Sequence, residues 1–361
     1  MLPIVSVPKS SIAFLVRTSP IGLTLASTVI LNWSHECDAQ TGQSIGRWRH
    51  FMMLGEGLFL MDKWSDQVAE LADALAPTVG HHATLARSVK IFRAESAVSN
   101  IPKFLHPGIL FVVQGMERLC CDVNVHIADS NHFLLTSAPL EFRIDTEAAA
   151  AMPLLAIQVA FDPATAMDIA QEIMRQDGSQ AGPAAICQTC GVVDPPLRDL
   201  LCRLLKTLRD PVSCRILMPG LIRELHFLLL KGHDGPAVLA GLQGEGTRGK
   251  VLKTAAELLN RRRTGVSINN VAAAAEISIS SYHSHFKALF GSTPLAYLKA
   301  ARLHEARGLL KSADIGIAAV SHAVGYRGTS QFSREFHRYF GRTAQSEQKL
   351  LREAQSNLDL V

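Results

Sequence analysis

Residues 325–341 read GYRGTSQFSREFHRYFG, and this stretch decides how the last third of the chain is expected to fold. Gly325 supplies a turn, and aromatic side chains then recur at intervals of four residues at Phe332, Phe336 and Phe340. That spacing places the three rings on one face of a helix from about residue 329 to 340, which Gly341 ends. We therefore expect the rings to face a core and the polar residues between them to face outward.

The same pattern occurs 50 residues earlier, where residues 278–294 read SISSYHSHFKALFGSTP. Phe286 and Gly291 stand where Phe336 and Gly341 stand in the later copy. Ser278 is suited to cap the helix that follows, because its hydroxyl can accept an otherwise unpaired backbone N–H. Each copy reads as a short helix, a tight turn and a longer helix. The other helices of this module are expected at Val251–Asn260, Ile268–Ala275, Pro294–Leu310 and from Asp314 to about Ala323.

The charge of the chain is concentrated in this module. Residues 248–345 contain 15 Lys and Arg against 5 Asp and Glu, whereas residues 1–247 contain 19 against 24. A net charge of +10 over 98 residues is typical of a domain that binds a polyanion. A helix-turn-helix places its second helix in the DNA major groove. The sequence therefore predicts double-stranded DNA as a partner, with two helices about 34 Å apart entering successive grooves.

The two copies, together with the connecting residues 302–307 (RLHEAR), resemble the arabinose-regulator (AraC/XylS) family of transcription factors. Residues 87–235 resemble, less specifically, the cupin-like N-terminal domain of one branch of that family, on the basis of residues 106–115 (HPGILFVVQG) and 223–230 (RELHFLLL). The resemblance implies a transcription regulator, more commonly an activator, that responds to a small-molecule effector and contacts RNA polymerase.

The resemblance also assigns the residues that read DNA. On the first helix they are Ser280, Ser281, His283 and Ser284, and on the second they are Thr329, Ser330, Gln331, Ser333 and Arg334. Lys287, Arg338 and the helix N-termini are candidates for phosphate contacts. Gln331 could pair with adenine and Arg334 with guanine or a phosphate. For each residue alone, the alternative is a solvated polar face.

Three positions depart from the family pattern. Gly328 stands where Ser or Asp usually caps the second helix, His337 replaces a usual Lys or Arg, and Ala344 replaces a common proline. Because the first helix has no Arg among its assigned reading residues, its base discrimination is expected to be modest or to pass through water.

The middle of the chain is rich in short strand signals separated by turn residues. They are Val89–Arg93, Ile109–Gln114, Leu119–Ile127, His132–Thr136, Leu140–Ile144 and Leu154–Phe161. Six strands at this spacing suggest an antiparallel barrel or sandwich, and a small barrel can hold one ligand.

Catalysis and metal binding are not indicated. His106, His126 and His132 are scattered, and the pair His283 and His285 lies on a predicted helix, where residues two apart point in different directions. The CxxC at Cys187 and Cys190 lacks two further ligands at a plausible spacing, so an incidental loop pair is favoured over a zinc site or a redox switch. We expect no catalytic residue, no metal and no cofactor.

Helices fill the segment between the strands and the basic module. Pro163 and Pro196 each open a helix, and a third is expected from about Ile216 to Leu230. Leucines in the second helix follow a one-face pattern that suits either a core or a two-helix dimer interface, and both remain open. They are Leu197, Leu200, Leu201, Leu204, Leu205 and Leu208. Six glycines between residues 232 and 249 favour a flexible connection.

The expected fold is α+β and multidomain. We expect an extension at 1–60 that is disordered or non-native and a cupin-like β-barrel with flanking helices at 61–235. A Gly-rich linker follows at 236–250, then an all-α module of two helix-turn-helix units at 251–345 and a tail at 346–361. Secretion through the apolar run at 21–31 is a weak alternative.

With 48% apolar and 19% charged residues, the composition does not suit a disordered or fibrous protein, and an odd count of seven cysteines suits the cytoplasm. The predicted function is a DNA-binding, effector-responsive regulator with no membrane partner, and a homodimer is left open as its assembly. The alternatives are a ligand-independent repressor whose N-terminal domain only dimerises, and a barrel enzyme with a DNA-binding adaptor.

Overall fold

A computed structural model describes residues 33–37, 44–48, 63–121, 124–177, 185–244, 246–263, 266–311 and 315–358. The chain divides into a unit that ends at Met61 and a unit that begins at Asp62. In the first unit, strands β1 (Trp33–Cys37) and β2 (Ser44–Trp48) form an antiparallel pair. The rest of the predicted N-terminal extension lies outside the described residues, as does Asp314.

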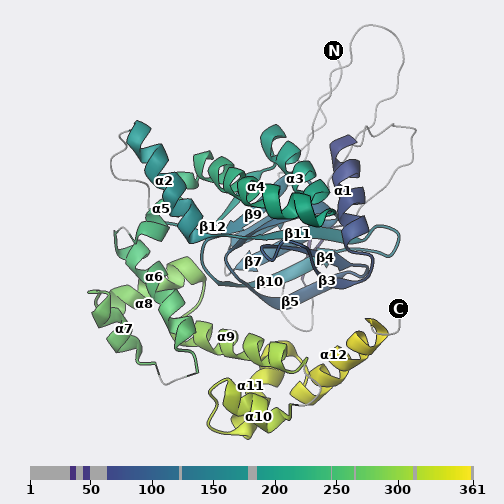
Figure 1. The fold of residues 1–361 in the computed structure, drawn as a ribbon. Coiled ribbons are helices and arrows are strands. Elements are labelled where there is room, and N and C mark those ends of the chain that lie inside the picture. The colour runs from purple at the N-terminus through teal and green to yellow at the C-terminus, as the bar shows by residue number, and fades with distance from the viewer. Residues whose placement is uncertain are drawn as a thin grey trace, which may run out of the picture. The chain divides into compact units, whose positions relative to one another are not determined.

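The second unit contains two antiparallel sheets, which we call the β domain (Figure 1). The larger sheet has the strand order β12-β9-β6-β11-β4-β3 and the smaller one β5-β10-β7-β8. Their bounds are β3 Gly80–Ala83, β4 Val89–Ala94, β5 Val98–Leu105, β6 Gly108–Gln114, β7 Met116–Cys121, β8 Asn124–Ala128, β9 His132–Thr136, β10 Leu140–Glu147, β11 Leu154–Ala160 and β12 Gln188–Val192. The strand pairing does not close the sheets into a barrel.

Side chains of the larger sheet alternate between two cores. On β6, Ile109 and Phe111 face a core shared with helices, whereas Leu110 and Val112 face the smaller sheet. Residues Leu119 and Phe142 of the smaller sheet complete this second core. A strand that is apolar on both faces is expected in the middle of a sheet that is covered on both sides.

Five of the six predicted strands are confirmed within a few residues. The sixth, Leu119–Ile127, is wrong, because its residues belong to two neighbouring antiparallel strands, β7 and β8. Three further strands of the β domain, β3, β5 and β12, were not predicted, nor were β1 and β2 of the first unit. Strand β5 contains Pro102 and a polar start, which weaken the pattern of β-branched and aromatic residues that marks a strand.

Helices cover the outer face of the larger sheet. They are α1 (Lys63–Leu75), α2 (Pro163–Asp177), α3 (Pro195–Thr207) and α4 (Pro211–Lys231). All six leucines of the stripe between Leu197 and Leu208 are buried in the core beneath these helices. The stripe is therefore core, and it does not present a surface to a second copy. No helix within the described ranges is long and apolar enough to cross a membrane.

The glycine-rich segment, for which the sequence favours a flexible connection, is largely helical. It forms α5 (Gly235–Gln243) and the start of α6 (Gly246–Asn260). A Cβ on Gly235 would lie 1.8 Å from the carbonyl oxygen of Leu230, and one on Gly249 would lie 2.5 Å from the carbonyl carbon of Gly244. These glycines therefore permit close packing, which composition alone cannot distinguish from flexibility.

The C-terminal module has the expected helices with one addition. They are α7 (Ile268–Ala274), α8 (Ile279–Phe290), α9 (Pro294–Leu309), α10 (Ile317–Ala323), α11 (Thr329–Phe340) and α12 (Ala344–Leu358). Helix α12 occupies the predicted tail. It is held in place by Glu347, whose buried carboxylate accepts hydrogen bonds or ion pairs from Arg307 at 2.6 Å and Arg342 at 3.3 Å.

Candidate nucleic-acid interface

The first recognition helix, α8, is built as the sequence indicates. Ser278 caps it, with its Oγ accepting the N–H of Ser281 at 3.3 Å. Tyr282 and Phe286 are fully buried on its inner face, and the Tyr282 hydroxyl shares a 2.8 Å hydrogen bond with Thr254 of α6. Gly291 ends the helix in the left-handed conformation.

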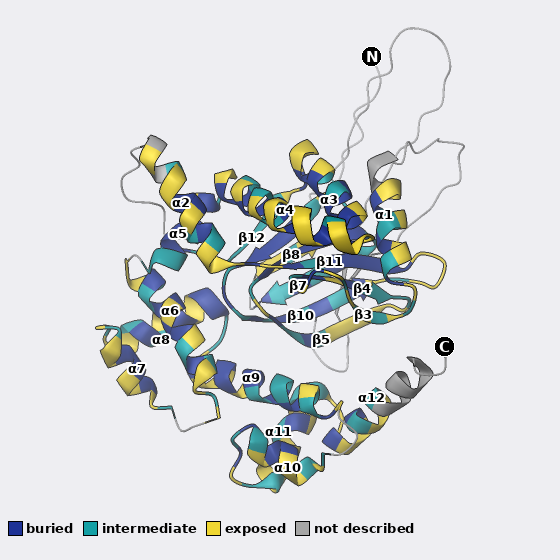
Figure 2. Cartoon of the chain, in the orientation of Figure 1, coloured by how far each residue is buried: buried dark blue, intermediate teal, exposed yellow. Residues whose placement is uncertain are grey.

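The predicted reading residues of α8 lie on its outer face. Ser280, Ser284 and Lys287 are exposed, and Ser281 and His283 are half-buried. The Lys287 ammonium forms no ion pair or hydrogen bond within the described part of the chain. The helix thus presents hydroxyls, an imidazole and one cation at its surface. Figure 2 shows both buried and exposed stretches on α8.

The second recognition helix, α11, separates its apolar inner face from its polar outer face more sharply than α8 does. Phe332 and Phe336 are buried, whereas Ser330, Gln331, Ser333, Arg334 and Arg338 are exposed and Thr329 is half-buried. Arg334 forms no hydrogen bond or ion pair with the residues that the structure describes. Gly328 is the N-cap of α11, and because glycine has no side chain it supplies no capping hydrogen bond.

Gln331 is less available than its exposure suggests. Its amide nitrogen donates to Glu335 Oε1 at 3.2 Å, and Glu335 also accepts from Lys299 of α9 at 3.2 Å and from the Tyr326 hydroxyl at 2.9 Å. Burial raises the pKa of Glu335, but these hydrogen bonds lower it more, so that the net pKa lies below the usual value. Glu335 therefore fixes α11 to α9, a role that sequence reasoning missed.

The arginine run after α6 is likewise committed to internal contacts. Arg262 Nε donates to Glu305 of α9 at 2.6 Å, and Arg263 pairs with the same carboxylate, with Nε at 2.9 Å. Arg302 donates back to the carbonyl oxygen of Arg262 at 2.6 Å. The backbone of Gly325 lies so close to Arg263 that a Cβ would be 2.7 Å from the Arg263 carbonyl oxygen. Arg262 and Arg263 thus join the two helix-turn-helix units.

The C-terminal end of α11 contacts the β domain. The Tyr339 hydroxyl donates to Glu141 Oε1 on β10 at 2.5 Å and lies 3.0 Å from His304 Nε2 on α9. The guanidinium of Arg143, also on β10, lies 5.5 Å from the centre of the Tyr339 ring. Burial lowers the pKa of His304 to about 3, with help from Arg307 and Arg143, so its ring is neutral at physiological pH.

The connecting helix α9 contacts the β domain as well. The buried Tyr297 donates its hydroxyl to the carbonyl oxygen of Pro139 at 2.9 Å, and the Phe104 ring of β5 lies 5.5 Å from the Tyr297 ring. Both helix-turn-helix units are therefore attached to the β domain through residues away from their predicted reading faces.

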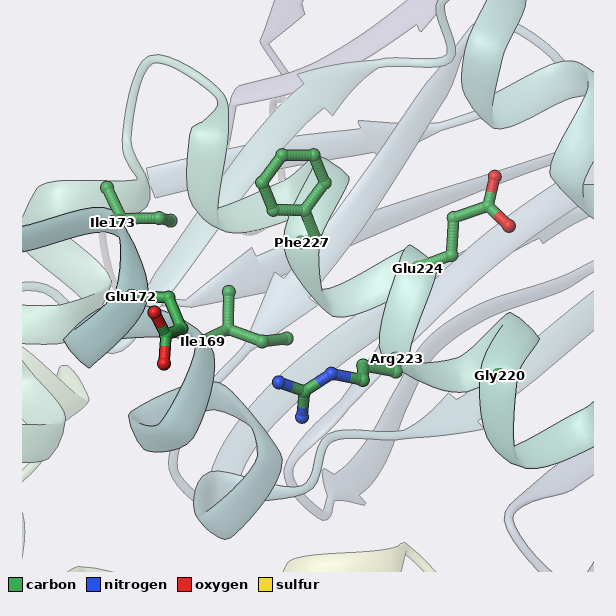
Figure 3. A pocket seen from close by; sticks show the side chains of 7 residues that line it. All are labelled: Ile169, Glu172, Ile173, Gly220, Arg223, Glu224 and Phe227. Atoms are coloured by element: carbon green, nitrogen blue, oxygen red, sulfur yellow. The ribbon is translucent and has the colours of Figure 1, made fainter. Parts of the chain in front are cut away.

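A separate groove lies between α2 and α4 (Figure 3). It has a volume of about 360 Å³ and is lined by Ile169, Ile173 and Phe227, with Glu172, Gly220, Arg223 and Glu224 at its sides. Arg223 pairs with Asp168 of α2 at 2.6 Å. The groove contains no nucleophile, and no group of three or more metal-ligating side chains occurs in the described ranges.

Two family descriptions match the chain in the order of its parts. The AraC-type transcriptional regulator N-terminus matches residues 86–237, and a helix-turn-helix domain matches residues 271–349. The chain belongs to the AraC-type transcriptional regulators. This AraC-type chain is 39% identical over 82 residues to the transcriptional activator NphR of a Rhodococcus species. The matched segment covers 23% of this chain and 24% of NphR.

A second relative is the transcriptional activator RhaS of Pectobacterium carotovorum, 30% identical over 89 residues, or 25% of this chain and 32% of RhaS. The matched segments thus span about a quarter to a third of these two curated relatives. Among solved structures, an apo variant of ToxT from Vibrio cholerae superposes with a TM-score of 0.52 at 8% identity, over 73% of this AraC-type chain and 98% of ToxT. That likeness shows a shared two-domain fold.

Proposed function

We propose that this protein binds specific DNA sequences through α8 and α11 and regulates transcription in response to a small molecule. The observation that carries the proposal is the outer face of the module. Polar side chains and the unpaired cations Lys287 and Arg334 lie along two recognition helices in a segment with a net charge of +10. Base edges are read by such side chains, and phosphates by such cations.

The test is selection of bound sequences from a random DNA pool by the full chain, followed by affinity measurement at two salt concentrations. Two short motifs separated by about one helical turn would support reading by both units. One short motif would assign reading to α11 alone, which has the arginine that α8 lacks. Binding with steep salt dependence but without an enriched motif would refute sequence-specific recognition.

The interior of the β domain is the proposed effector site, because buried polar atoms there have no partner. Glu117 on β7 is fully buried, and its Oε1 lies 3.4 Å from Lys103 Nζ and 3.5 Å from the Thr146 hydroxyl. Its Oε2 has no hydrogen-bond partner among the residues that the structure describes. The same holds for Nε2 of His126 on β8 and Oε1 of Gln188 on β12. Buried polar atoms are normally paired, so a polar small molecule or ordered water is expected at these positions.

The relatives NphR and RhaS carry the word activator in their names, and on that basis we propose activation through contact with RNA polymerase in the cytoplasm. A repressor that needs no ligand is the rival proposal. An effector-dependent change in DNA affinity or in promoter output would exclude it, and output that falls when the protein is supplied would favour it. We propose no catalytic activity for the β domain; a turnover or metal-content assay on the purified protein would reveal one.

If the protein dimerises, we propose that the outer face of α4 meets the same face of a second copy. Residues Val212, Ile216, Gly220, Arg223, Phe227 and Lys231 are all exposed and follow one another at intervals of four, four, three, four and four. The sequence of intervals is the same from either end of the helix. In an antiparallel pair of α4 helices, Ile216 of each copy would therefore lie opposite Phe227 of the other copy. We expect Ile216→Asp to yield monomers in sedimentation, and the exposed Val79→Asp to leave the oligomeric state unchanged.

A further inference from the structure

Two thiols of the β domain meet the C-terminal end of the first recognition helix. Cys187 Sγ, just before β12, donates to the carbonyl oxygen of Leu289 at 3.1 Å. Cys121 Sγ, at the end of β7, donates to the carbonyl oxygen of Phe290 at 3.8 Å. Both cysteines are buried, with 2% and 4% of their surface exposed, and neither forms a disulfide.

The last carbonyl groups of α8 need hydrogen-bond donors from outside the helix. The last carbonyl groups of a helix have no donor within the helix. The N–H of Gly291 accounts for the carbonyl of Lys287, but Leu289 and Phe290 are themselves buried, so water does not freely reach their carbonyl groups. A thiol is a weak donor, yet two of them act here on successive carbonyl groups.

Burial also keeps the Cys187 thiol in its protonated form. It raises the pKa of the Cys187 thiol to about 12, with a further contribution from the neighbouring Cys121. A thiol that keeps its proton at physiological pH keeps its ability to donate a hydrogen bond, and it is a poor nucleophile. Cys187 is therefore suited to a permanent structural contact rather than to thiol chemistry.

We propose that Cys121 and Cys187 form a thiol clasp that positions the first recognition helix, so that the β domain sets how α8 meets DNA. The inference rests on the proposed DNA-binding function. It names Cys121 and Cys187 as positioning residues, because they act on the reading side chains only through the backbone of α8.

The clasp also connects α8 to the proposed effector site. Cys121 lies on the same face of β7 as Glu117, and Cys187 directly precedes Gln188. Within the described part of the chain, Glu117 Oε2 and Gln188 Oε1 have no hydrogen-bond partner. A hydrogen-bond donor that bound these oxygen atoms would therefore act on the two segments that hold the end of α8. Because both atoms are hydrogen-bond acceptors, the ligand chemistry that would satisfy them is a hydroxyl group or another hydrogen-bond donor.

The first experiment measures the contact itself by amide hydrogen exchange in the full chain. Cys121→Ala and Cys187→Ala remove the donors, whereas Cys121→Ser and Cys187→Ser keep one. We expect exchange in the last turn of α8 to be about tenfold faster in the Ala variants and close to wild type in the Ser variants. Cys202→Ala is the matched control, since this buried thiol lies on α3 and contacts Gln67 at 3.8 Å. Equal exchange in wild-type and Ala variants would overturn the clasp.

The second experiment asks whether the clasp positions α8 on DNA. Each variant is titrated with the selected duplex and with a duplex in which the part read by α8 is scrambled. The Ala variants should lose about tenfold in affinity for the intact duplex, which corresponds to about 1.4 kcal/mol, and nothing for the scrambled one, with recovery in the Ser variants. Equal losses on both duplexes, or no loss on either, would overturn the positioning role. If wild type selects no sequence, the proposed function fails, while the exchange result still decides whether the clasp exists.

Discussion

Replacing Tyr339 by Phe should weaken the attachment of the second helix-turn-helix unit to the β domain. The substitution removes one hydroxyl, which donates to Glu141 at 2.5 Å and contacts His304 at 3.0 Å. It keeps the ring that packs against the Arg143 guanidinium at 5.5 Å. The expected loss is therefore the hydrogen-bond contribution alone.

A hydrogen bond to a charged acceptor contributes about 1.5–3 kcal/mol. Tyr339 and Glu141 are both half-buried, so solvent screening places the expected loss at about 1–2 kcal/mol. Burial raises the pKa of Glu141, and the Tyr339 hydrogen bond lowers it. The variant should therefore raise the Glu141 pKa further, which a carboxyl titration by NMR would detect.

The assay is a double-mutant cycle of urea unfolding followed by circular dichroism, with Tyr339→Phe, Glu141→Gln and the double variant. Because the two side chains contact each other, we expect a coupling energy of about 1 kcal/mol. Tyr339→Phe combined with Glu147→Gln, at the exposed end of the same strand, should be additive. If the Tyr339 and Glu141 effects also add to within about 0.5 kcal/mol, the contact does not link the two domains in solution.

Three further predictions concern the DNA-binding module. Arg334→Ala should cost about 1–3 kcal/mol in DNA affinity and relax preference at one position if the residue reads a base; an equal loss on all sequences would assign it to phosphate. Glu305→Gln should destabilise the module by about 1 kcal/mol at neutral pH, since two arginines bind this carboxylate. Burial raises the pKa of Glu305 but the arginines lower it more, so this stabilisation exists above the usual value of 4.5 and is lost as the pH falls through the lowered one. Acid unfolding should therefore show the stability difference between wild type and Glu305→Gln shrinking as the pH falls. A difference that stays constant with pH would contradict this assignment. Gly328→Ser should raise stability by a few tenths of a kcal/mol in thermal unfolding, because the position is open and extended; a loss would contradict the capping assignment.

The sequence predicted the C-terminal module almost residue by residue, because its helices carry strong local signals. Ser278, Pro294 and the glycines at 291 and 341 mark the ends of helices, and the phenylalanines mark their inner faces. The reading residues were assigned through the family resemblance, and most of them are exposed. Their contacts with DNA remain predictions.

What the sequence did not predict depends on contacts between distant residues. Glu305 and Glu335 look like ordinary surface carboxylates until the fold brings arginine, lysine and tyrosine donors to them. Cys187 reads as half of a loop pair with Cys190, and its partner at Leu289 lies 102 residues away. The leucine stripe of α3 is compatible with either a core or a dimer, and only the packing of α1 and α4 against it decides between them.

Both proposed recognition helices are held at their C-terminal ends, whereas their predicted reading residues begin near their N-terminal ends. A small rotation about the held end therefore moves the first reading residues the most. Helix α8 has 12 residues and is therefore about 18 Å long. A tilt of about 10° at the thiol-bound end would move its N-terminus by about 3 Å, as far as a hydrogen bond is long. A change in the β domain too small to alter its fold could thus decide whether the side chains near Ser280 reach a base edge at all.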